Sequence, residues 1–532
     1  MPTARLRLSR NTIRFSRMPR FPTLAPATLA PPGAAPGRNA PTAADASTQP
    51  LPLDDELPRT RGWEAGPRRR RLLIAIGALA LALRLILLPF GHYWDLTVDY
   101  NVFIDLARGQ SPYETFRVMS NITRAAGWDS VYQYYAYPPV PLYIYWLPAQ
   151  IFHALHPAAG YVFPIPFAAS NATATPIIPL DFYLLFKAPV WLADFGIAAL
   201  LARMSGTIRG WRDYLLNPYV LLISGAWTFD AIMVLGLLMA VYLIARGRPG
   251  WAGVALAFGA MIKYIPALAA PTIILYLIKK RRPMREILLF TGAFIAACVL
   301  FIGPFWRGLL TVVTFHSERV GGGMNWEIIF GQSWLFPAGT NLGALQLAVT
   351  SFGTPTLIIT LLLAWWWVFT RDMSLNHMIL ITLFAFFVGS KLVNEQYALV
   401  ALPFLWLEAR RSGGAWRRFY QLFWIIPLAF AIMHVPIDHF LYTAYHTFFG
   451  HRADLVNGTG ITGLNYPILP WASARFRLPI MTSLGISFTI LSVVALLWPA
   501  PPWSYTPAPA LATPDALEPE ITPGAASRES HP

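Results

Sequence analysis

The fold class is decided by residues 68–90, which read RRRRLLIAIGALALALRLILLPF. Four arginines precede a 19-residue apolar run, 72–90, that only Arg84 interrupts. A helix needs about 20 apolar residues to cross a bilayer, and cytoplasmic loops are enriched in Lys and Arg. The stretch therefore predicts a membrane-spanning helix whose basic end lies in the cytoplasm.

The rest of the chain has the same apolar character. Of its 532 residues, 55% are hydrophobic and 13% are charged, whereas soluble proteins carry about 25% charged residues. The single cysteine, Cys298, excludes an intrachain disulfide and a metal site built from several cysteines. The composition indicates an all-α polytopic membrane protein. Further apolar runs lie at 138–156, 181–202, 214–227, 229–245, 251–278, 286–304, 355–370, 377–390, 396–409, 419–434 and 478–498.

The net charge of +15 is concentrated near the N-terminus, where residues 1–71 hold 13 arginines and five acids. This location indicates an orientation signal and not a nucleic-acid partner. We expect 1–71 to be a disordered basic cytoplasmic tail, 72–498 to be the membrane domain, and the Pro-rich 499–532 to be a second disordered cytoplasmic tail. Alternatively, the first 30 residues resemble a transit peptide or follow a misplaced start codon.

Basic connections between the apolar runs predict the topology. The basic residues on both sides of 251–278 are expected to face the cytoplasm, so the run between them must cross the membrane an even number of times. We therefore expect a helical hairpin that crosses twice and is broken near 263–266. The same reasoning predicts a re-entrant pair between 138 and 180. The basic connections lie at 203–212, 246–248, 279–285 and 410–418, and the outward segments are 91–137, 224–230, 263–266, 305–354, 390–396 and 435–477.

The first outer segment carries the residues best suited to chemistry. Residues 99–108 read as a short amphipathic helix that lies at the membrane interface, with Asp99 at its start. Asp99 is then either a helix N-cap or a base held at the membrane surface. The cluster YYAYPP at 134–139 is either part of an interfacial aromatic belt or a platform for sugar rings.

Two later charged residues lie next to apolar segments. Asp230 either caps the helix that follows it or binds a polyhydroxylated acceptor. Lys263 lies inside an apolar run, where a lysine at mid-membrane costs about 2.5–3.5 kcal/mol. Three roles are compatible with Lys263, namely contact with a lipid phosphate, snorkelling to the interface, or an internal ion pair with Asp or Glu.

Two further outward segments are rich in polar residues. The loop 305–354 contains Arg319 and three consecutive glycines, 321–323, which favour a mobile segment that folds over a ligand. Solvation explains the charges of this loop equally well. The turn 391–397 has five polar residues among seven, which is more than a turn between two helices needs.

The sequence DYNVFID at 99–105, followed by SPY at 111–113 and YPP at 137–139, resembles the first luminal loop of two related groups. These are the glycosylphosphatidylinositol mannosyltransferase I family and the bacterial polyprenyl-phosphate-mannose-dependent mannosyltransferases. The resemblance covers roughly 72–434 and continues through Asn217-Pro218 with Asp230, KYIP at 263–266 and EQY at 395–397. Both groups have the GT-C fold, so the resemblance implies that fold, with about 11–14 transmembrane or re-entrant helices.

The resemblance also implies an activity. The chain is expected to be an inverting glycosyltransferase, of mannosyl type, that moves a sugar from a polyprenyl-phosphate donor to a glycan or glycolipid acceptor on the outer face of the cell membrane. Asp99 corresponds to the general base. The motif of these families often has two acids close together, but here Thr97 occupies the position two before Asp99, and Asp95 lies four before it.

The proposed chemistry requires no cofactor and no metal. A polyprenyl phosphate is a good leaving group, so one carboxylate suffices to deprotonate the acceptor hydroxyl. A divalent cation on the carboxylates is compatible with the same scheme. We expect nine residues to bind donor or acceptor, namely Asp95, Asp105, Tyr137, Asp230, Lys263, Arg319, Lys391, Gln396 and Tyr397.

Two other classes share the predicted membrane location. Transporters and flippases also contain broken helices and intramembrane charges. However, no inverted repeat is visible among the apolar runs, and the polar groups collect in the outward loops. A ligase or acyltransferase acting on lipid-linked glycans is the third class.

Overall fold

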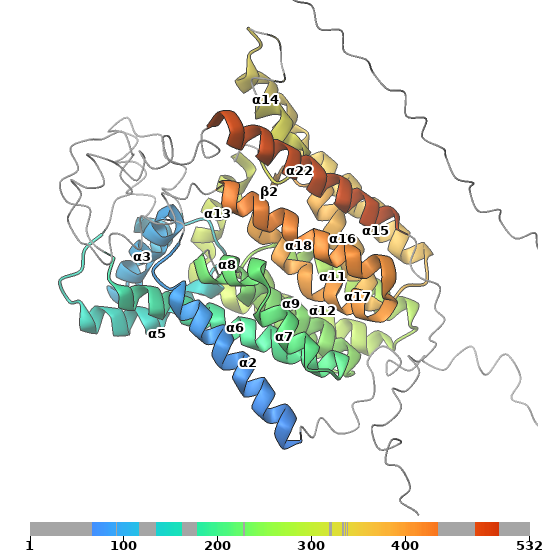
Figure 1. Ribbon diagram of the computed structural model, residues 1–532, viewed down its shortest axis with the longest axis horizontal. Helices are drawn as coiled ribbons and strands as arrows, with labels where there is room; N and C mark the ends of the chain where they lie inside the picture. The colour runs from blue at the N-terminus through green and yellow to red at the C-terminus, as the bar shows by residue number, and fades with distance from the viewer. Residues whose placement is uncertain are drawn as a thin grey trace, which may run out of the picture. The chain divides into compact units, whose positions relative to one another are not determined.

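The apolar runs are mainly helical in the structure, a computed structural model that describes residues 66–91, 93–115, 135–161, 178–226, 229–318, 322–331, 335, 337, 339–434 and 474–498. Within these residues, the only strands are β1 (Gly322–Gly323) and β2 (Leu392–Val393), which pair in parallel. The predicted all-α class is confirmed. The 3₁₀-helices are η3 (Ile265–Leu268), η4 (Gly303–Phe305), η5 (Trp326–Gly331) and η7 (Glu395–Val400). The α-helices are α2 (Pro67–Ile86), α3 (Tyr93–Ala107), α5 (Val140–Leu155), α6 (Leu180–Ser205), α7 (Arg209–Leu215), α8 (Pro218–Ala226), α9 (Asp230–Ala245), α10 (Pro249–Ala260), α11 (Ala269–Lys279), α12 (Met284–Ile302), α13 (Trp306–Glu318), α14 (Leu342–Ser351), α15 (Gly353–Thr370), α16 (Leu375–Gly389), α17 (Leu402–Ser412), α18 (Gly414–His434) and α22 (Ala474–Leu497) (Figure 1).

The chain is a polytopic membrane protein by the length and apolarity of its helices. In the described part, four helices are long and apolar enough to cross a bilayer, or five if the bent pair of α8 and α9 forms one span. The expected 11–14 included re-entrant helices, and shorter apolar helices such as Ile265–Lys279 and Leu375–Gly389 are not counted as spans. Helix α2, which contains most of the first predicted span, is not among the spans either, although it has 20 residues. The four spans are Leu180–Ser205, Met284–Gly308, Leu342–Thr370 and Arg477–Leu497.

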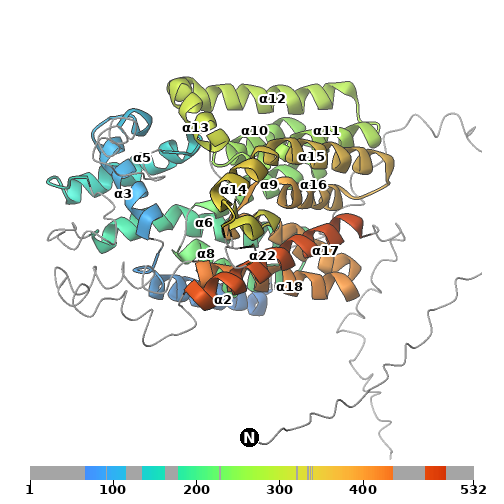
Figure 2. The same ribbon diagram turned by 90° about the horizontal axis from the view of Figure 1, so that it is seen from above.

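The run 251–278 forms the predicted helical hairpin. Helix α9 leads from Asp230 to Arg246, α10 returns to Lys263, and α11 leads back to Lys279. We call the end of these helices that carries Arg246 and Lys279 the basic end, and the end that carries Asp230 and Lys263 the site end. The 16 residues of α9 separate the two ends by about 24 Å. Figure 2 shows α12, α15 and α16 extending in the same general direction.

Small residues bring α9, α10 and α12 into close contact. A Cβ on Gly236 would lie 2.7 Å from the Cα of Gly259, and a Cβ on Gly253 would collide with the backbone of Phe290. Such small-residue contacts let helix backbones approach in a membrane, where packing drives association. The contact between Gly236 and Gly259 also fixes the relative position of the site ends of α9 and α10.

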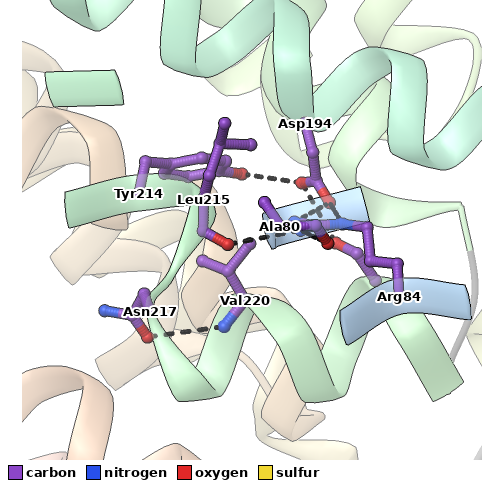
Figure 3. Close-up of polar contacts among 8 residues, drawn as sticks. Ala80, Arg84, Asp194, Tyr214, Leu215, Asn217 and Val220 are labelled. Carbon is purple, nitrogen blue, oxygen red and sulfur yellow. Dashed lines mark hydrogen bonds and ion pairs between the residues drawn. The ribbon is translucent and has the colours of Figure 1, made fainter. Parts of the chain in front are cut away.

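The only charge in the first apolar run, Arg84, is buried and paired. Its Nη2 donates to Oδ2 of Asp194 on α6 at 2.8 Å, and its Nη1 donates to the Leu215 carbonyl oxygen at 3.2 Å. The Tyr214 hydroxyl donates to the other Asp194 oxygen at 3.3 Å (Figure 3). Because a buried charge is tolerated only when it is paired and hydrogen-bonded, this network joins α2 to α6 and α7.

A second buried cation fixes the point at which the chain leaves α2. Lys187 on α6 is fully buried and donates to the carbonyl oxygens of Leu88 at 2.7 Å and Phe90 at 2.6 Å. These carbonyl groups follow the last turn of α2, where the helix dipole favours a cation. The short link from α2 to α3 is therefore held against α6.

Helix α3 is longer than the sequence predicts. It begins at Tyr93, so Asp99 lies in its interior and the N-cap interpretation of Asp99 is wrong. Asn101 and Asp105, on the face predicted to be polar, are buried along with Tyr100 on the apolar face. Helix α3 packs beside α5 (Figure 1) and exposes neither face fully to water.

Several predictions concern residues that the structure describes only in part. Helix α2 begins at Pro67, so the four arginines 68–71 form its first turns and do not end a tail. Residues 1–65 and 499–532, the rest of the two expected tails, lie outside the described residues. Of the predicted re-entrant pair, α5 is described, whereas 162–177 lie outside the described residues.

Candidate active site

The buried ion pair of Lys263 and Asp230 lies at the site end. Lys263 follows α10, and its Nζ donates to both carboxylate oxygens of Asp230 at 2.8 Å. Asp230 is fully buried and is the first residue of α9, and the N-cap position before it is occupied by Phe229. Of the three roles considered for Lys263, the structure has the internal ion pair, and the N-cap interpretation of Asp230 is wrong.

Aromatic rings surround the Lys263 ammonium group. Its Nζ lies 5.3 Å from the ring centres of Tyr137 and Tyr397 and 5.6 Å from that of Phe229. Cations at such distances are attracted to the ring faces. Tyr137 is therefore part of the site and not of an interfacial aromatic belt, and Tyr135 is buried. Tyr134 lies outside the described residues.

Asp95 and Asp99 occupy one face of α3. They are four residues apart, which places both carboxylates on the same side of the helix, one turn from each other. Burial raises the pKa of Asp99 well above its usual value, the charge of Asp95 raises it further, and the charge of Lys263 lowers it. Asp99 is thus within electrostatic reach of the Lys263 ammonium group.

The Asp99 carboxylate has no direct partner in the described part of the chain. Its side chain is 4% exposed, and no described residue donates a hydrogen bond to it or forms an ion pair with it. Structural buried carboxylates are normally hydrogen-bonded. A buried, unpartnered carboxylate with a raised pKa is instead typical of a group kept for proton transfer.

Asp105 belongs to a different cluster. It is fully buried, and it accepts a hydrogen bond from the Tyr161 hydroxyl at 2.7 Å. Burial raises its pKa to about 6, and the hydrogen bond from Tyr161 opposes the shift. The guanidinium group of Arg108 lies 4.9 Å from the centre of the Tyr161 ring. Asp105 therefore has Tyr161 as a hydrogen-bond partner, and the structure does not bring it together with Lys263.

A cavity of about 270 Å³ opens beside Lys263. Four of the predicted binding residues line it, namely Tyr137, Lys263, Lys391 and Tyr397. Its polar wall also contains His316 of α13. Apolar side chains from η3, α15, α16 and β2 also line the cavity, namely Leu268, Leu357, Phe386 and Leu392.

Tyr137 connects this cavity to the carboxylates of α3. Its ring lines the cavity and faces Lys263. Burial raises the pKa of Tyr137, and the charges of Asp95 and Asp99 raise it further. Asp99 itself does not line the cavity. The site thus has an acidic part on α3 and a basic, partly apolar part, with Tyr137 between them.

A contact with a glycine positions Lys391 at the cavity. A Cβ on Gly353 would collide with the stem of the Lys391 side chain, so this stem occupies the space that a larger residue at 353 would fill. Burial lowers the pKa of Lys391, and the charge of Glu327 raises it. The Lys391 ammonium group therefore lies in a partly dry environment next to an acid.

The predicted glycine segment is tied to the Lys391 turn. Gly322 donates its N–H to the Lys391 carbonyl oxygen at 2.8 Å, and Met324 donates to that of Val393 at 2.6 Å. Gly323 has φ of +83°, and a Cβ there would collide with the Val393 backbone. Residues 322–324 are thus paired with β2 and do not form a free segment over the site. Arg319 and residue 321 lie outside the described residues.

The turn after β2 contributes one residue to the cavity and one to a buried network. Tyr397 lines the cavity, whereas Gln396 does not. Gln396 is 5% exposed, and its side-chain oxygen accepts no hydrogen bond from the described residues. Glu395 lies 3.0 Å from the ring of His434 on α18 and accepts, through its backbone carbonyl, the hydroxyl of Tyr219.

Sequence reasoning gave no site role to two residues near the cavity. His316 lines the cavity, and its ring lies 2.9 Å from the Ala136 carbonyl oxygen. Glu327 is 2% exposed, and burial raises its pKa to about 7 while the Lys391 charge lowers it. Both lie in the loop 305–354, whose charges fit a segment that covers a ligand and ordinary solvation equally well. The signal that would have separated them from ordinary loop charges is their burial, which the sequence does not reveal.

Metal ligation has one candidate position at the site. Asp95 and Asp99 are the two carboxylates that share a helix face. Among the described residues, no group of three or more His, Cys, Asp or Glu side chains is arranged to hold a metal ion.

With this geometry described, comparison with known proteins adds one finding. The model of glycosyltransferase family 87 matches residues 228–393. The match indicates glycosyltransferase activity in a membrane protein, and it includes Asp230, Lys263, His316 and Lys391. Helix α3, with Asp99, lies outside the part similar to family 87. No curated protein matches the chain.

Proposed function

We propose that this protein is an inverting mannosyltransferase of the GT-C fold that uses a polyprenyl-phosphate-linked donor, with Asp99 as the general base. The acceptor is a glycan or glycolipid on the outer face of the cell membrane. The similarity to family 87 supports glycosyl transfer. The resemblance of residues 99–105 to mannosyltransferases of this type supports the sugar and the donor.

The observation that carries the proposal is the state of Asp99. It is a buried carboxylate without a hydrogen-bond donor among the described residues, and burial raises its pKa well above the usual value for an aspartate, which makes it a stronger base. An acceptor hydroxyl that approaches Asp99 would supply the missing donor. Asp95 on the same helix face raises the basicity of Asp99 through its negative charge.

The cavity supports a lipid-linked phosphate as the donor. Lys391 and His316 offer positive charge or N–H groups to a phosphate. The same cavity is also lined by apolar side chains. Some of these side chains come from α15 and α16, which belong to the apolar helices of the membrane domain. An amphiphile with a phosphate at one end and a hydrocarbon chain at the other fits both surfaces. We assign the first phosphate contact to Lys391, whose side chain lines this cavity.

The proposed reaction balances without a further reactant. Asp99 takes the proton of the acceptor hydroxyl, and the oxygen forms a bond to the anomeric carbon of the donor. The bond between that carbon and the phosphate oxygen breaks, and its electron pair leaves with the polyprenyl phosphate, which Lys391 stabilises. Attack opposite the leaving group inverts the anomeric carbon, so a β-linked donor gives an α-linked product. No cofactor takes part, and a divalent cation would bind at Asp95 and Asp99.

The topology supports the outer face. Arg246 and Lys279 lie at the basic end, which the positive-inside rule assigns to the cytoplasm. Asp230 and Lys263 lie at the opposite end, about 24 Å away along α9. The site then faces the exterior, where lipid-linked sugars serve as donors because nucleotide sugars are confined to the cytoplasm.

The experiment that tests the proposal is direct. Purified protein is incubated with polyprenyl-phosphate mannose and candidate acceptors, and release of polyprenyl phosphate is measured together with the anomeric configuration of the product. We expect turnover that Asp99→Asn lowers by about 10²-fold or more, the range for loss of a general base. Adding EDTA should leave the rate unchanged.

Asp181→Asn provides the matched control. Asp181 begins α6 and lies 2.6 Å from the His156 ring, away from the cavity lining. This variant removes the same charge and should keep the wild-type rate. Equal rates for Asp99→Asn and wild type would refute the role of Asp99, and hydrolysis or transport of the donor without transfer would refute the transferase.

A further inference from the structure

A second and larger cavity lies at the basic end, remote from the candidate active site. It has a volume of about 790 Å³ and is formed by α7, the start of α8, α17 and α18. Helix α18 has 21 residues and leads from this cavity to His434, which contacts Glu395 at 3.0 Å. The helix is about 31 Å long, so the two cavities are separated by roughly the thickness of the hydrocarbon core.

Four arginines surround the cavity. Arg209 and Arg212 come from α7, Arg410 from α17, and Arg417 from α18. A tight turn brings the last two together, because Gly413 and Gly414, with φ of +63° and +40°, connect α17 directly to α18. Both glycines also line the cavity.

The positive charge around the cavity is not balanced by the protein. Asp213 is the only acid that lines it. One oxygen of Asp213 accepts hydrogen bonds from Arg212 at 2.9 and 2.7 Å, and the other accepts one from the Trp406 indole at 3.2 Å. Within the described residues, Arg209, Arg410 and Arg417 have no carboxylate at ion-pair distance.

The unpaired arginines are close enough to repel one another. Burial lowers the pKa of Arg410, the like charges of Arg209 and Arg417 lower it further, and the charge of Asp213 opposes these shifts. An anion between these groups would remove the repulsion, and planar guanidinium groups match the oxygens of a phosphate.

The deeper walls of the cavity are aromatic and apolar. Trp424 lies seven residues after Arg417 on α18, which places it on the same face and about 10 Å further into the helix bundle. Leu216 and Tyr420 line the same side. The cavity is therefore basic at the helix ends and mainly aromatic along α18, where Tyr420 and Trp424 flank Gln421, and this order from charge to aromatic surface suits a phospholipid better than a small soluble anion.

We propose that this cavity binds the headgroup of an anionic phospholipid, with the phosphate among Arg209, Arg410 and Arg417 and the first part of an acyl chain along Trp424. The site is independent of the proposed transferase activity. It gives the basic end a specific lipid contact in addition to its general attraction to anionic membranes.

The test measures lipid retention. Purified protein is exchanged into detergent with phosphatidylglycerol or, separately, phosphatidylcholine, and bound lipid is quantified by native mass spectrometry. We expect phosphatidylglycerol to be retained preferentially, and Arg410→Gln/Arg417→Gln to weaken its binding by on the order of tenfold or more, since charge-assisted hydrogen bonds are lost. The single variant Arg417→Gln should show a smaller loss.

Arg248→Gln/Arg285→Gln is the matched control. Arg248 precedes α10 and Arg285 lies in α12, so this double variant removes the same charge from the basic end but outside the cavity lining. It should retain phosphatidylglycerol like wild type. Equal losses in the two double variants, equal retention of the two lipids, or competition by inorganic phosphate as effective as that by phosphatidylglycerol would each overturn the proposal. Gel filtration verifies that each variant is folded.

Discussion

The ammonium group of Lys263 lies 2.8 Å from each carboxylate oxygen of Asp230, and three aromatic rings surround the pair. The pair joins the start of α9 to the residues that follow α10. It therefore fixes the break in the 251–278 hairpin at the wall of the 270 Å³ cavity.

Removal of one partner of this pair should destabilise the protein. Asp230→Leu leaves an uncompensated buried ammonium group, at a cost of about 3–5 kcal/mol. We expect a lower melting temperature for Asp230→Leu and for Lys263→Met, and recovery of most of it in the double variant. Thermal unfolding followed by fluorescence-detected gel filtration measures this. A double variant no more stable than either single variant would show that the pair does not hold the hairpin.

The pH dependence of transfer should report the pair of acids on α3. In the proposed mechanism, Asp99 acts as a base only when it is deprotonated, and its pKa is raised by burial and by Asp95. The rate should therefore fall as the pH drops through this raised pKa. Asp95→Asn removes a like charge, so the acid limb of kcat/KM should move to lower pH. An unchanged midpoint would show that Asp95 does not act on the base.

Gly353 should control the position of Lys391. Gly353→Ala introduces a Cβ where the Lys391 stem lies, so the ammonium group must move away from the donor phosphate. Loss of one charge-assisted hydrogen bond corresponds to roughly a tenfold increase in KM for the lipid donor, with little change in KM for the acceptor.

Gly343→Ala is the control for this substitution. Gly343 lies on α14, and a Cβ there meets only the Asn341 side chain, at 3.6 Å. Its kinetic constants should equal those of wild type. A similar rise of KM for both substrates in Gly353→Ala would indicate a general distortion and not a displaced Lys391.

The orientation of the chain is tested by cysteine labelling. Asp99, Asp230 and Lys263 are buried, so labels belong at exposed positions close to each end. In a Cys298→Ala background, Glu114→Cys should react with an impermeant maleimide added outside intact cells, and Arg285→Cys should react only after the cells are opened. The reverse pattern would invert the proposed topology.

The break in the 251–278 hairpin was predictable because its signals are local. Basic residues flank 251–278 on both sides, and Pro266 follows Lys263 within the run, so the parity of the crossings requires a break there. The helix boundaries near 286, 355 and 419 follow from apolar length for the same reason. In contrast, the start of α3 at Tyr93 was missed, because Asp99 resembles an N-cap residue, whereas the residue directly before Tyr93 is His92.

The contacts of the site were not predictable, because they join residues that are distant in sequence. Asp230 is 33 residues from Lys263, and Asp194 is 110 from Arg84. Charge type limits the possible partners but does not select one. Burial is equally hidden: Asp105 was expected to bind substrate, yet its partner is Tyr161, 56 residues away. The residue types of the site were expected, whereas their pairing depends on tertiary packing.

Two backbone hydrogen bonds, from Gly322 to Lys391 and from Met324 to Val393, have a mechanical consequence. They join residues 322–324, which precede α14, to residues 391–393, which follow α16. Neither segment can therefore move away from the cavity without the other. If the donor is a long-chain lipid that enters past Lys391, as proposed, its entry displaces 322–324 as well, and the two segments should open together at one common rate.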